Sequence, residues 1–179
     1  MTRILLCCGA SVAIYKGCDL ASKLTQAKHD VRVVLTPSAA KLINPQLFEA
    51  VTSQIAEVDE FGPGRRGAMD HIDLAKWAEL LLVAPATADL VGKLALGLGD
   101  DLVTTVALAY PAGKPRIICP AMNPQMLEQP AVRRNLASLR GDGWVILEPE
   151  AGHMACGDEG KGRLPEVETI LARVREILA

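Results

Sequence analysis

The chain alternates short, uninterrupted apolar runs with longer segments in which apolar residues recur at helical spacing. An apolar run of four or five residues bounded by turn residues is typical of a strand buried on both faces of a parallel sheet. We expect such strands at residues 4–8, 31–35, 80–84, 116–119 and 144–147. This alternation predicts an α/β fold: a doubly wound parallel sheet, Rossmann-like or flavodoxin-like, with right-handed crossovers and helices on both faces.

The segments between the expected strands predict helices and two long loops. Helical spacing or a capping residue indicates helices at residues 12–26, 45–51, 71–78, 88–96, 102–109, 130–140 and 166–178. Residues 52–70 show weak periodicity, so we expect a long loop there. Residues 151–164 carry four glycines, and because glycine weakens helices and strands alike, we expect a second loop.

Composition and charge exclude several classes of protein. The 179 residues contain no internal repeat or linker, so we expect a single domain over residues 1–179. The formal net charge of −2 argues against a nucleic-acid partner, and no apolar run approaches the roughly 20 residues that cross a bilayer. The five cysteines include no C-x-x-C pair, so they indicate neither a disulfide framework nor a metal site, and they suit a reducing cytoplasm.

Small polar residues follow the carboxyl ends of the expected strands, at Ser11, Thr36, Ser38, Thr87 and Asn123. In an open parallel sheet those ends form the ligand-binding edge, and hydroxyls beside helix starts suit a phosphate. The chain has neither a G-x-G-x-x-G sequence after the first strand nor a P-loop sequence, so ordinary dinucleotide and P-loop sites are not indicated. A nucleotide or flavin phosphate is expected, and FMN, with its single phosphate, needs neither fingerprint.

Three residues are candidates for chemistry. His71 follows the first expected loop and opens a helix, so it is either a general acid–base or an ordinary helix-start residue. Asn123 either contacts a ligand or caps the short helix that follows Pro124. Cys156 lies among glycines, where packing gives no reason for a thiol, whereas the other four cysteines lie in or beside expected core segments.

Six motifs occur in an order and at spacings that resemble one protein family. They are Gly9-Ala-Ser-Val-Ala-Ile-Tyr-Lys16, His71-Ile-Asp-Leu-Ala, Pro85-Ala-Thr-Ala-Asp89, Gly99-Asp-Asp-Leu102, Pro120-Ala-Met-Asn-Pro-Gln-Met126 and Ala155-Cys-Gly-Asp-Glu-Gly-Lys-Gly-Arg163. Together they extend over nearly the whole chain, which resembles the flavin-dependent cysteine decarboxylases. The chain departs from the usual family pattern at Asp89, where asparagine is usual.

The resemblance implies a role for each motif. His71 would be the active-site histidine, Asn123 would bind the substrate carboxylate, and Cys156 would donate a proton late in the reaction. The implied FMN-binding residues are Gly9, Ala10, Ser11, Val12, Thr36, Ser38, Thr87, Ala88, Asp89, Leu90 and Ala121. A flap at residues 153–164 would close over the substrate, and the implied substrate contacts are Asn123, His153, Met154, Ala155 and Leu164.

The motifs most resemble the branch of this family that acts in coenzyme A biosynthesis. That branch implies FMN-dependent decarboxylation of 4′-phosphopantothenoylcysteine to 4′-phosphopantetheine, through thioaldehyde and enethiol intermediates. It also implies a homotrimer, or a homododecamer built from trimers, with FMN and His71 near a subunit boundary. Because residues 1–179 leave no room for a fused synthase domain, a separate synthase is expected in the cytoplasm.

Three other functions are compatible with parts of the sequence. A peptidyl-cysteine decarboxylase shares FMN, His71 and the Pro-Ala-Met-Asn turn, but its reaction stops at the enethiol, so Cys156 favours the coenzyme A reaction. A flavin prenyltransferase of the same fold matches the motifs less well. A non-catalytic flavoprotein or regulatory subunit would have no use for His71, Asn123 and Cys156 together.

Overall fold

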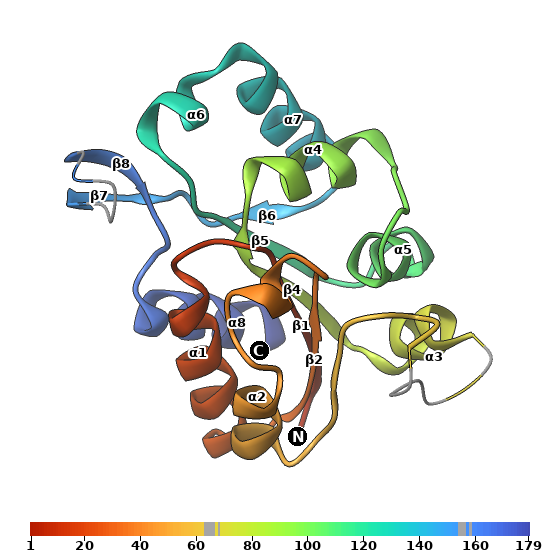
Figure 1. Ribbon diagram of the computed structural model, residues 1–179. Coiled ribbons are helices and arrows are strands. Elements are labelled where there is room, and N and C mark those ends of the chain that lie inside the picture. Colours follow the sequence, from red (N-terminus) through yellow and green to blue (C-terminus); the bar gives the residue numbers. More distant parts are fainter. Residues whose placement is uncertain (63–66, 68, 154–156, 158) are drawn as a thin grey trace.

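The computed structural model describes residues 1–62, 67, 69–153, 157 and 159–179. Its centre is a parallel sheet with the spatial order β3-β2-β1-β4-β5-β6 (Figure 1). The strands are β1 (Arg3–Cys8), β2 (Asp30–Leu35), β3 (Ala56–Glu57), β4 (Leu80–Ala86), β5 (Arg116–Pro120) and β6 (Val145–Ile146), followed by an antiparallel hairpin of β7 (Glu150–His153) and β8 (Glu159–Arg163). This is the Rossmann strand order, and without the short edge strand β3 it is the flavodoxin order. The predicted doubly wound sheet is confirmed.

Helices cover both faces of the sheet, as the alternation predicted. They are α1 (Ile14–Gln26), η1 (Ala39–Lys41), α2 (Gln46–Thr52), α3 (Asp70–Trp77), α4 (Ala88–Leu96), α5 (Leu102–Ala109), α6 (Pro124–Glu128), α7 (Pro130–Gly141) and α8 (Val167–Leu178). Residues of α1, α2 and α8 form one core layer, and residues of α3, α4, α5 and α7 form the other. Leu6 belongs to the first layer and Leu5 to the second, because successive side chains of a strand point to opposite faces.

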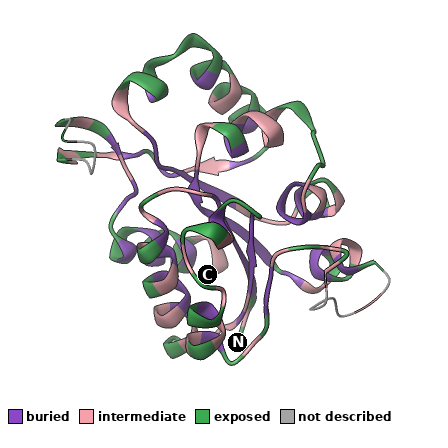
Figure 2. Cartoon of the chain, viewed as in Figure 1, coloured by how far each residue is buried: buried purple, intermediate pink, exposed green. Residues whose placement is uncertain are grey.

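The buried strands lie between these two helical layers (Figure 2). None of the helices in the described part of the chain is long and apolar enough to cross a bilayer.

The strand order changes direction between β1 and β4, and the turn after β1 contacts the end of β4. The Gly9 amide donates a hydrogen bond to the Pro85 carbonyl at 2.8 Å. A Cβ atom at position 9 would lie 3.0 Å from that oxygen, so glycine permits the close approach. Ligands of open α/β sheets bind in the crevice outside such a switch point, and the fold therefore places the site at this edge.

Part of the expected loop at residues 52–70 is a short edge strand. β3 pairs with β2 through Val33–Ala56 and Val34–Glu57. A strand of two residues is too short to produce an alternating pattern, so periodicity could not reveal it. The prediction of an unbroken loop was wrong at this point.

The predicted loop at residues 151–164 was also wrong, because much of this segment forms the β7–β8 hairpin. Gly152 and Gly160 are paired across the hairpin, with φ angles of 156° and 155°. A Cβ atom at position 160 would lie 2.9 Å from Cγ of Pro124, so glycine lets β8 pack against the start of α6. The low strand propensity of glycine argued against a strand here. The hydrogen bonds between the two strands involve only the backbone, however, and the packing against Pro124 leaves no room for a side chain at position 160.

Candidate functional site

Two adjoining clefts lie at the carboxyl ends of the strands. The switch-point cleft, of about 560 Å³, is lined by Ala10, Ser11, Thr36, Pro37, Ser38, Thr87, Ala88, Asp89, Leu90, Lys93, Asp100, Asp101, Ala121, Met122 and Met126. The hairpin cleft, of about 290 Å³, is lined by Ser11, Val12, Ala13, Tyr15, Lys16, Ala121, Met122, Asn123, His153, Gly162, Arg163 and Leu164. Ser11, Ala121 and Met122 line both, so ligands in the two clefts would lie next to each other.

The switch-point cleft brings together most of the residues predicted to bind FMN. Its lining contains Ala10, Ser11, Thr36, Ser38, Thr87, Ala88, Asp89, Leu90 and Ala121. Val12 lines the hairpin cleft instead, and Gly9 lines neither cleft but contacts Pro85. The sheet explains this convergence, because the turns after parallel strands meet at one edge. That these residues bind FMN stays a prediction.

Three hydroxyl groups in the switch-point cleft are held in place by the backbone. Ser11 Oγ, Thr36 Oγ1 and Thr87 Oγ1 each accept a hydrogen bond from an amide two or three residues further along, at 3.1–3.2 Å. A hydroxyl that accepts in this way keeps its hydrogen to donate. The start of the nine-residue helix α4 lies beside them, and its dipole favours an anion. This donor set and this volume fit a phosphate-bearing cofactor such as a flavin mononucleotide.

The same cleft also has acidic residues in its wall. Asp89, Asp100 and Asp101 line it together with Lys93, whose Nζ lies 3.2 Å from the Asp89 carboxylate and 3.0 Å from that of Asp100. The hydrogen bonds that Lys93 donates to the carboxylates of Asp100 and Asp89 raise the pKa of Lys93. The lysine offsets part of the negative charge that would repel a phosphate. Our sequence interpretation missed Lys93, although its i+4 spacing from Asp89 was an available signal.

Asn123 lies in the hairpin cleft and also caps a helix. Its Oδ1 accepts a hydrogen bond from the Gln125 amide at 2.8 Å, at the start of α6. The two sequence interpretations of Asn123 are therefore compatible. The Met122 amide next to it donates to the Gly162 carbonyl at 3.0 Å, which joins β8 to the turn after β5.

Two further residues predicted to contact the substrate, His153 and Leu164, also line the hairpin cleft. The other predicted members, Met154, Ala155 and Cys156, lie outside the described residues. Lys16 and Arg163 line the cleft as well; the sequence interpretation gave Lys16 no role and placed Arg163 only within the flap. Tyr15 completes this side of the cleft.

His71 lines neither cleft. It is the second residue of α3, and its Nδ1 pairs with the Glu60 carboxylate. The helix α3 and the β7–β8 hairpin lie on opposite sides of the molecule (Figure 1). A single chain therefore does not bring His71 and Asn123 into one cleft.

Glu60 is a candidate that the sequence interpretation missed. A carboxylate on Nδ1 orients the imidazole ring and favours the tautomer in which Nε2 can accept a proton. Glu60 lines a hollow of about 180 Å³ that shares Pro37, Asp100 and Asp101 with the switch-point cleft. The His71–Glu60 pair therefore lies near the rim of that cleft. No local pattern in the sequence links positions 60 and 71.

Three of the four cysteines predicted to be structural are fully buried, and the fourth, Cys18, is partly buried and packs against the core. Cys7, Cys8 and Cys119 are fully buried, and burial raises the pKa of each thiol. A thiol with a raised pKa in an apolar environment is a poor nucleophile. These three cysteines act as small core residues.

A doubly wound sheet with a phosphate-fitting crevice at its switch point is typical of the α/β proteins that bind nucleotides or flavins. The Flavoprotein family matches residues 1–179, and the chain belongs to this family. The cofactor class is therefore a flavin, as the sequence predicted.

Relatives of known name agree with this assignment. The coenzyme A biosynthesis bifunctional protein CoaBC of Bacillus subtilis (strain 168) is 46% identical over 169 residues, which are 94% of this chain and 41% of that protein. The chain thus spans about two-fifths of the length of this relative. A PPC decarboxylase mutant complexed with pantothenoylaminoethenethiol is 32% identical with a TM-score of 0.87, covering 99% of this chain and 98% of that one. The FMN binding protein AtHal3 is 32% identical with a TM-score of 0.84, covering 98% and 95%.

Proposed function

We propose that this chain is an FMN-dependent decarboxylase that converts 4′-phosphopantothenoylcysteine to 4′-phosphopantetheine in coenzyme A biosynthesis. The observation that carries the proposal is that the hairpin cleft, with Asn123, adjoins the switch-point cleft through Ser11, Ala121 and Met122. A substrate carboxylate held by Asn123 would lie beside a flavin in the neighbouring cleft. The names of the CoaBC relative and of the PPC decarboxylase structure support this choice of reaction.

Flavin binding would rest on the hydroxyl groups of the switch-point cleft. Ser11, Thr36 and Thr87 would donate to phosphate and ribityl oxygens, while the fixed backbone hydrogen bonds keep these hydroxyls oriented. The chemistry that a bound flavin supplies is two-electron oxidation of the substrate carbon next to sulfur, which gives the departing carboxylate an electron sink.

Asn123 would hold the substrate carboxylate through its amide group. A neutral amide donates hydrogen bonds to a carboxylate without placing a full positive charge beside it. A cation there would stabilise the ground state more than the transition state, in which the carboxylate charge moves onto the substrate. The capping hydrogen bond that its Oδ1 accepts from the Gln125 amide fixes the side chain in this position.

His71 would act as a general acid–base and Glu60 as its positioning residue. Since one chain does not bring His71 to the hairpin cleft, a second copy would contribute it at a subunit boundary. We therefore propose a trimer or a multiple of trimers as the active assembly.

Cys156, outside the described residues, would donate the proton that, together with the two electrons that a bound reduced flavin would return, reduces the enethiol to the saturated thiol. In the sequence it lies between β7 and β8, and β8 helps to line the hairpin cleft. Residues 1–179 would act together as one decarboxylase domain.

The experiment is a product assay on the protein loaded with FMN. With phosphopantothenoylcysteine we expect one CO₂ and one 4′-phosphopantetheine for each substrate consumed. A peptide that ends in cysteine serves as the comparison substrate. Turnover of the peptide alone would replace the proposal with the peptidyl-cysteine reaction, and no turnover of either would favour a non-catalytic flavoprotein.

A further inference from the structure

The hairpin cleft has a cationic wall that decarboxylation itself does not require. Lys16 lies in the first turn of α1 and Arg163 at the end of β8, and both line the cleft. Lys16 Nζ lies 2.9 Å from Glu166 Oε1, and Arg163 Nη2 donates to the same oxygen at 2.9 Å. Because one oxygen atom holds both groups, the ammonium and the guanidinium are close enough to contact a single anion.

The positive charge of this wall is only partly balanced at the cleft. Within the described part of the chain, none of the residues that line the hairpin cleft carries a carboxylate. Glu166 is shared by two cations, and Lys16 holds the pKa of Glu166 below its usual value. Glu150 accepts a hydrogen bond from the Glu166 amide at 3.2 Å but does not line the cleft.

Position 16 is an unusual environment for a lysine. Its side chain is only 12% exposed, and it lies in the first turn of a helix, where the dipole disfavours a cation. A buried ammonium is costly unless it is paired or has a function. An anion bound in the cleft would be favoured by the lysine and by the start of the helix together.

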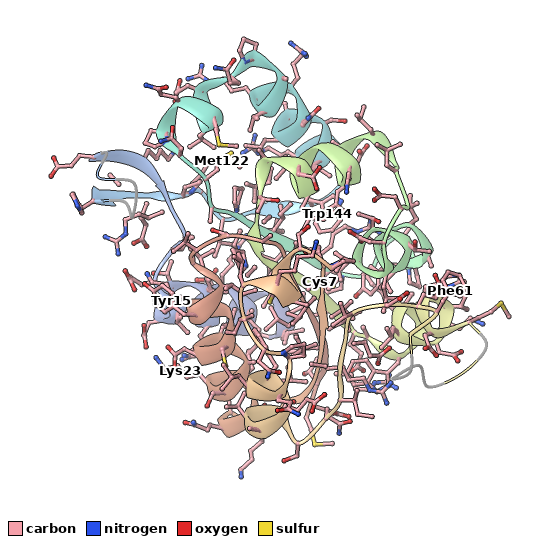
Figure 3. The ribbon with its side chains drawn as sticks, in the orientation of Figure 1. Cys7, Tyr15, Lys23, Phe61, Met122 and Trp144 are labelled. Atoms are coloured by element: carbon pink, nitrogen blue, oxygen red, sulfur yellow. The ribbon has the colours of Figure 1, made fainter. Side chains whose placement is uncertain are left out.

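The hairpin cleft also offers apolar surface next to the two cations. Val12 and Tyr15 are 69% and 63% exposed and line the same cleft. Tyr15 lies at the start of α1, on the side of the molecule that carries the hairpin (Figure 3). This combination fits a ligand whose anionic end lies next to a branched apolar group. In a phosphorylated pantothenoyl arm the phosphate is attached next to a dimethyl carbon.

One glycine of the hairpin leaves room for the arginine. A Cβ atom at position 152 would lie 2.6 Å from Nη1 and 2.9 Å from Cδ of Arg163. Gly152 therefore lets the guanidinium lie across β7 and reach Glu166. The hairpin therefore does two things: it borders the cleft, and it holds Arg163 in a defined position.

We infer that Lys16 and Arg163 form a phosphate subsite that selects the phosphorylated pantothenoyl arm of the substrate. The subsite rests on the proposed function and adds to it the residues that distinguish this substrate from its unphosphorylated form. Val12 and Tyr15 contact the apolar part of the arm. Glu166 holds the two cations in place.

The test measures binding of two unreactive fragments to the FMN-loaded protein by calorimetry. The probes are 4′-phosphopantothenate and pantothenate, which differ only in the phosphate. We expect the wild type to bind the phosphorylated probe more tightly. Lys16→Gln and Arg163→Gln should each reduce this preference about tenfold, which is the effect of losing one charge-assisted hydrogen bond. Lys23→Gln is the matched control, because Lys23 is in the same helix, pairs with Asp19 and Glu168, and lines neither cleft.

Equal binding of the two probes by the wild type would overturn the subsite. So would a Lys16→Gln or Arg163→Gln variant that keeps the full preference or weakens both probes equally. Arg163→Lys keeps the positive charge and should retain part of the preference that Arg163→Gln loses. This comparison does not depend on Lys16→Gln, so it tests the subsite even where Lys16→Gln reduces folding. A preference for the phosphorylated probe without CO₂ release would support the subsite and remove the proposed function. Equal turnover of phosphopantothenoylcysteine and pantothenoylcysteine would support the proposed function and remove the subsite.

Discussion

The two clefts are built in different ways from neighbouring parts of the molecule. The switch-point cleft consists of strand ends and helix starts, with hydroxyl groups oriented by backbone amides. The hairpin cleft consists of the turn after β1, the turn after β5 and the hairpin, and it carries an amide and two cations. The first suits a cofactor that stays in place, and the second suits a substrate that enters and leaves. Substitutions at Asn123, Thr87 and Gly160 should each disturb one cleft and leave ligand binding in the other unchanged.

The largest effect should come from His71, which lines neither cleft of its own chain. His71→Asn should bind FMN normally and lose decarboxylation by about a hundredfold to ten-thousandfold, the range of general acid–base catalysis. The measurements are the flavin content and the rate of CO₂ release. Glu60→Gln should lower kcat by a smaller factor with KM unchanged, and Glu60→Asp should restore part of it. Undiminished turnover by His71→Asn would remove the histidine from the mechanism.

Asn123→Asp should affect the hairpin cleft alone. Aspartate caps a helix as well as asparagine does, so α6 should stay intact, while the new charge repels the substrate carboxylate. We expect kcat/KM to fall about a hundredfold, equivalent to roughly 3 kcal/mol, with FMN affinity unchanged. Steady-state kinetics and flavin titration measure the two quantities. A parallel loss of FMN would mean that the clefts are not separable.

Thr87→Val should make the complementary change in the switch-point cleft. It removes a hydroxyl that lines the cleft and accepts from the Leu90 amide, so we expect FMN affinity to fall about tenfold. At saturating FMN the substrate KM should match that of the wild type. Thr87→Ser keeps the hydroxyl and serves as the control. An unchanged FMN dissociation constant in Thr87→Val would show that this hydroxyl does not contact the cofactor.

Gly160→Ala should disturb the hairpin with a smaller effect on activity. The new Cβ would lie 2.9 Å from Pro124, at a φ of 155°, so β8 must move away from α6. We expect kcat/KM to fall about tenfold while FMN binding is unchanged, because none of the described hairpin residues lines the switch-point cleft. Gly141→Ala is the control, because a Cβ there meets nothing within 4 Å. Wild-type kinetics in Gly160→Ala would separate the hairpin from substrate binding.

The smallest effect concerns a surface ion pair between Lys23 and Glu168, neither of which lines a cleft. Lys23 lowers the pKa of Glu168 below its usual value of 4.5, so the carboxylate stabilises the fold above about pH 4.5 and loses this contribution as pH falls through its lowered pKa. Glu168→Gln should therefore melt slightly below the wild type at pH 7 and together with it at strongly acidic pH. Melting curves across this range test the sign. A difference that grows as the pH falls would contradict it.

The sequence predicted the switch-point cleft well for a physical reason. Apolar runs locate parallel strands, and parallel strands end at one edge, so Ser11, Thr36 and Thr87 had to converge there. No tertiary information was needed for this step.

The hairpin cleft was harder to predict because its contacts are distant in sequence. Propensity gave a loop at residues 151–164, but packing against Pro124 and the ladder hydrogen bonds favour a hairpin there. The meeting of Lys16 with Arg163 and Glu166 joins the first helix to the last hairpin, which no local pattern reports. The same holds for the pairing of Glu60 with His71.

The central claim is that the two adjoining clefts serve one reaction. The flavin absorbance of the purified, FMN-loaded protein after anaerobic addition of phosphopantothenoylcysteine tests this claim most directly. We predict a transient loss of the oxidised flavin absorbance followed by its recovery as phosphopantetheine accumulates. In Cys156→Ser we predict that the absorbance falls and does not recover. A wild-type spectrum that stays unchanged while the substrate is bound would contradict the account.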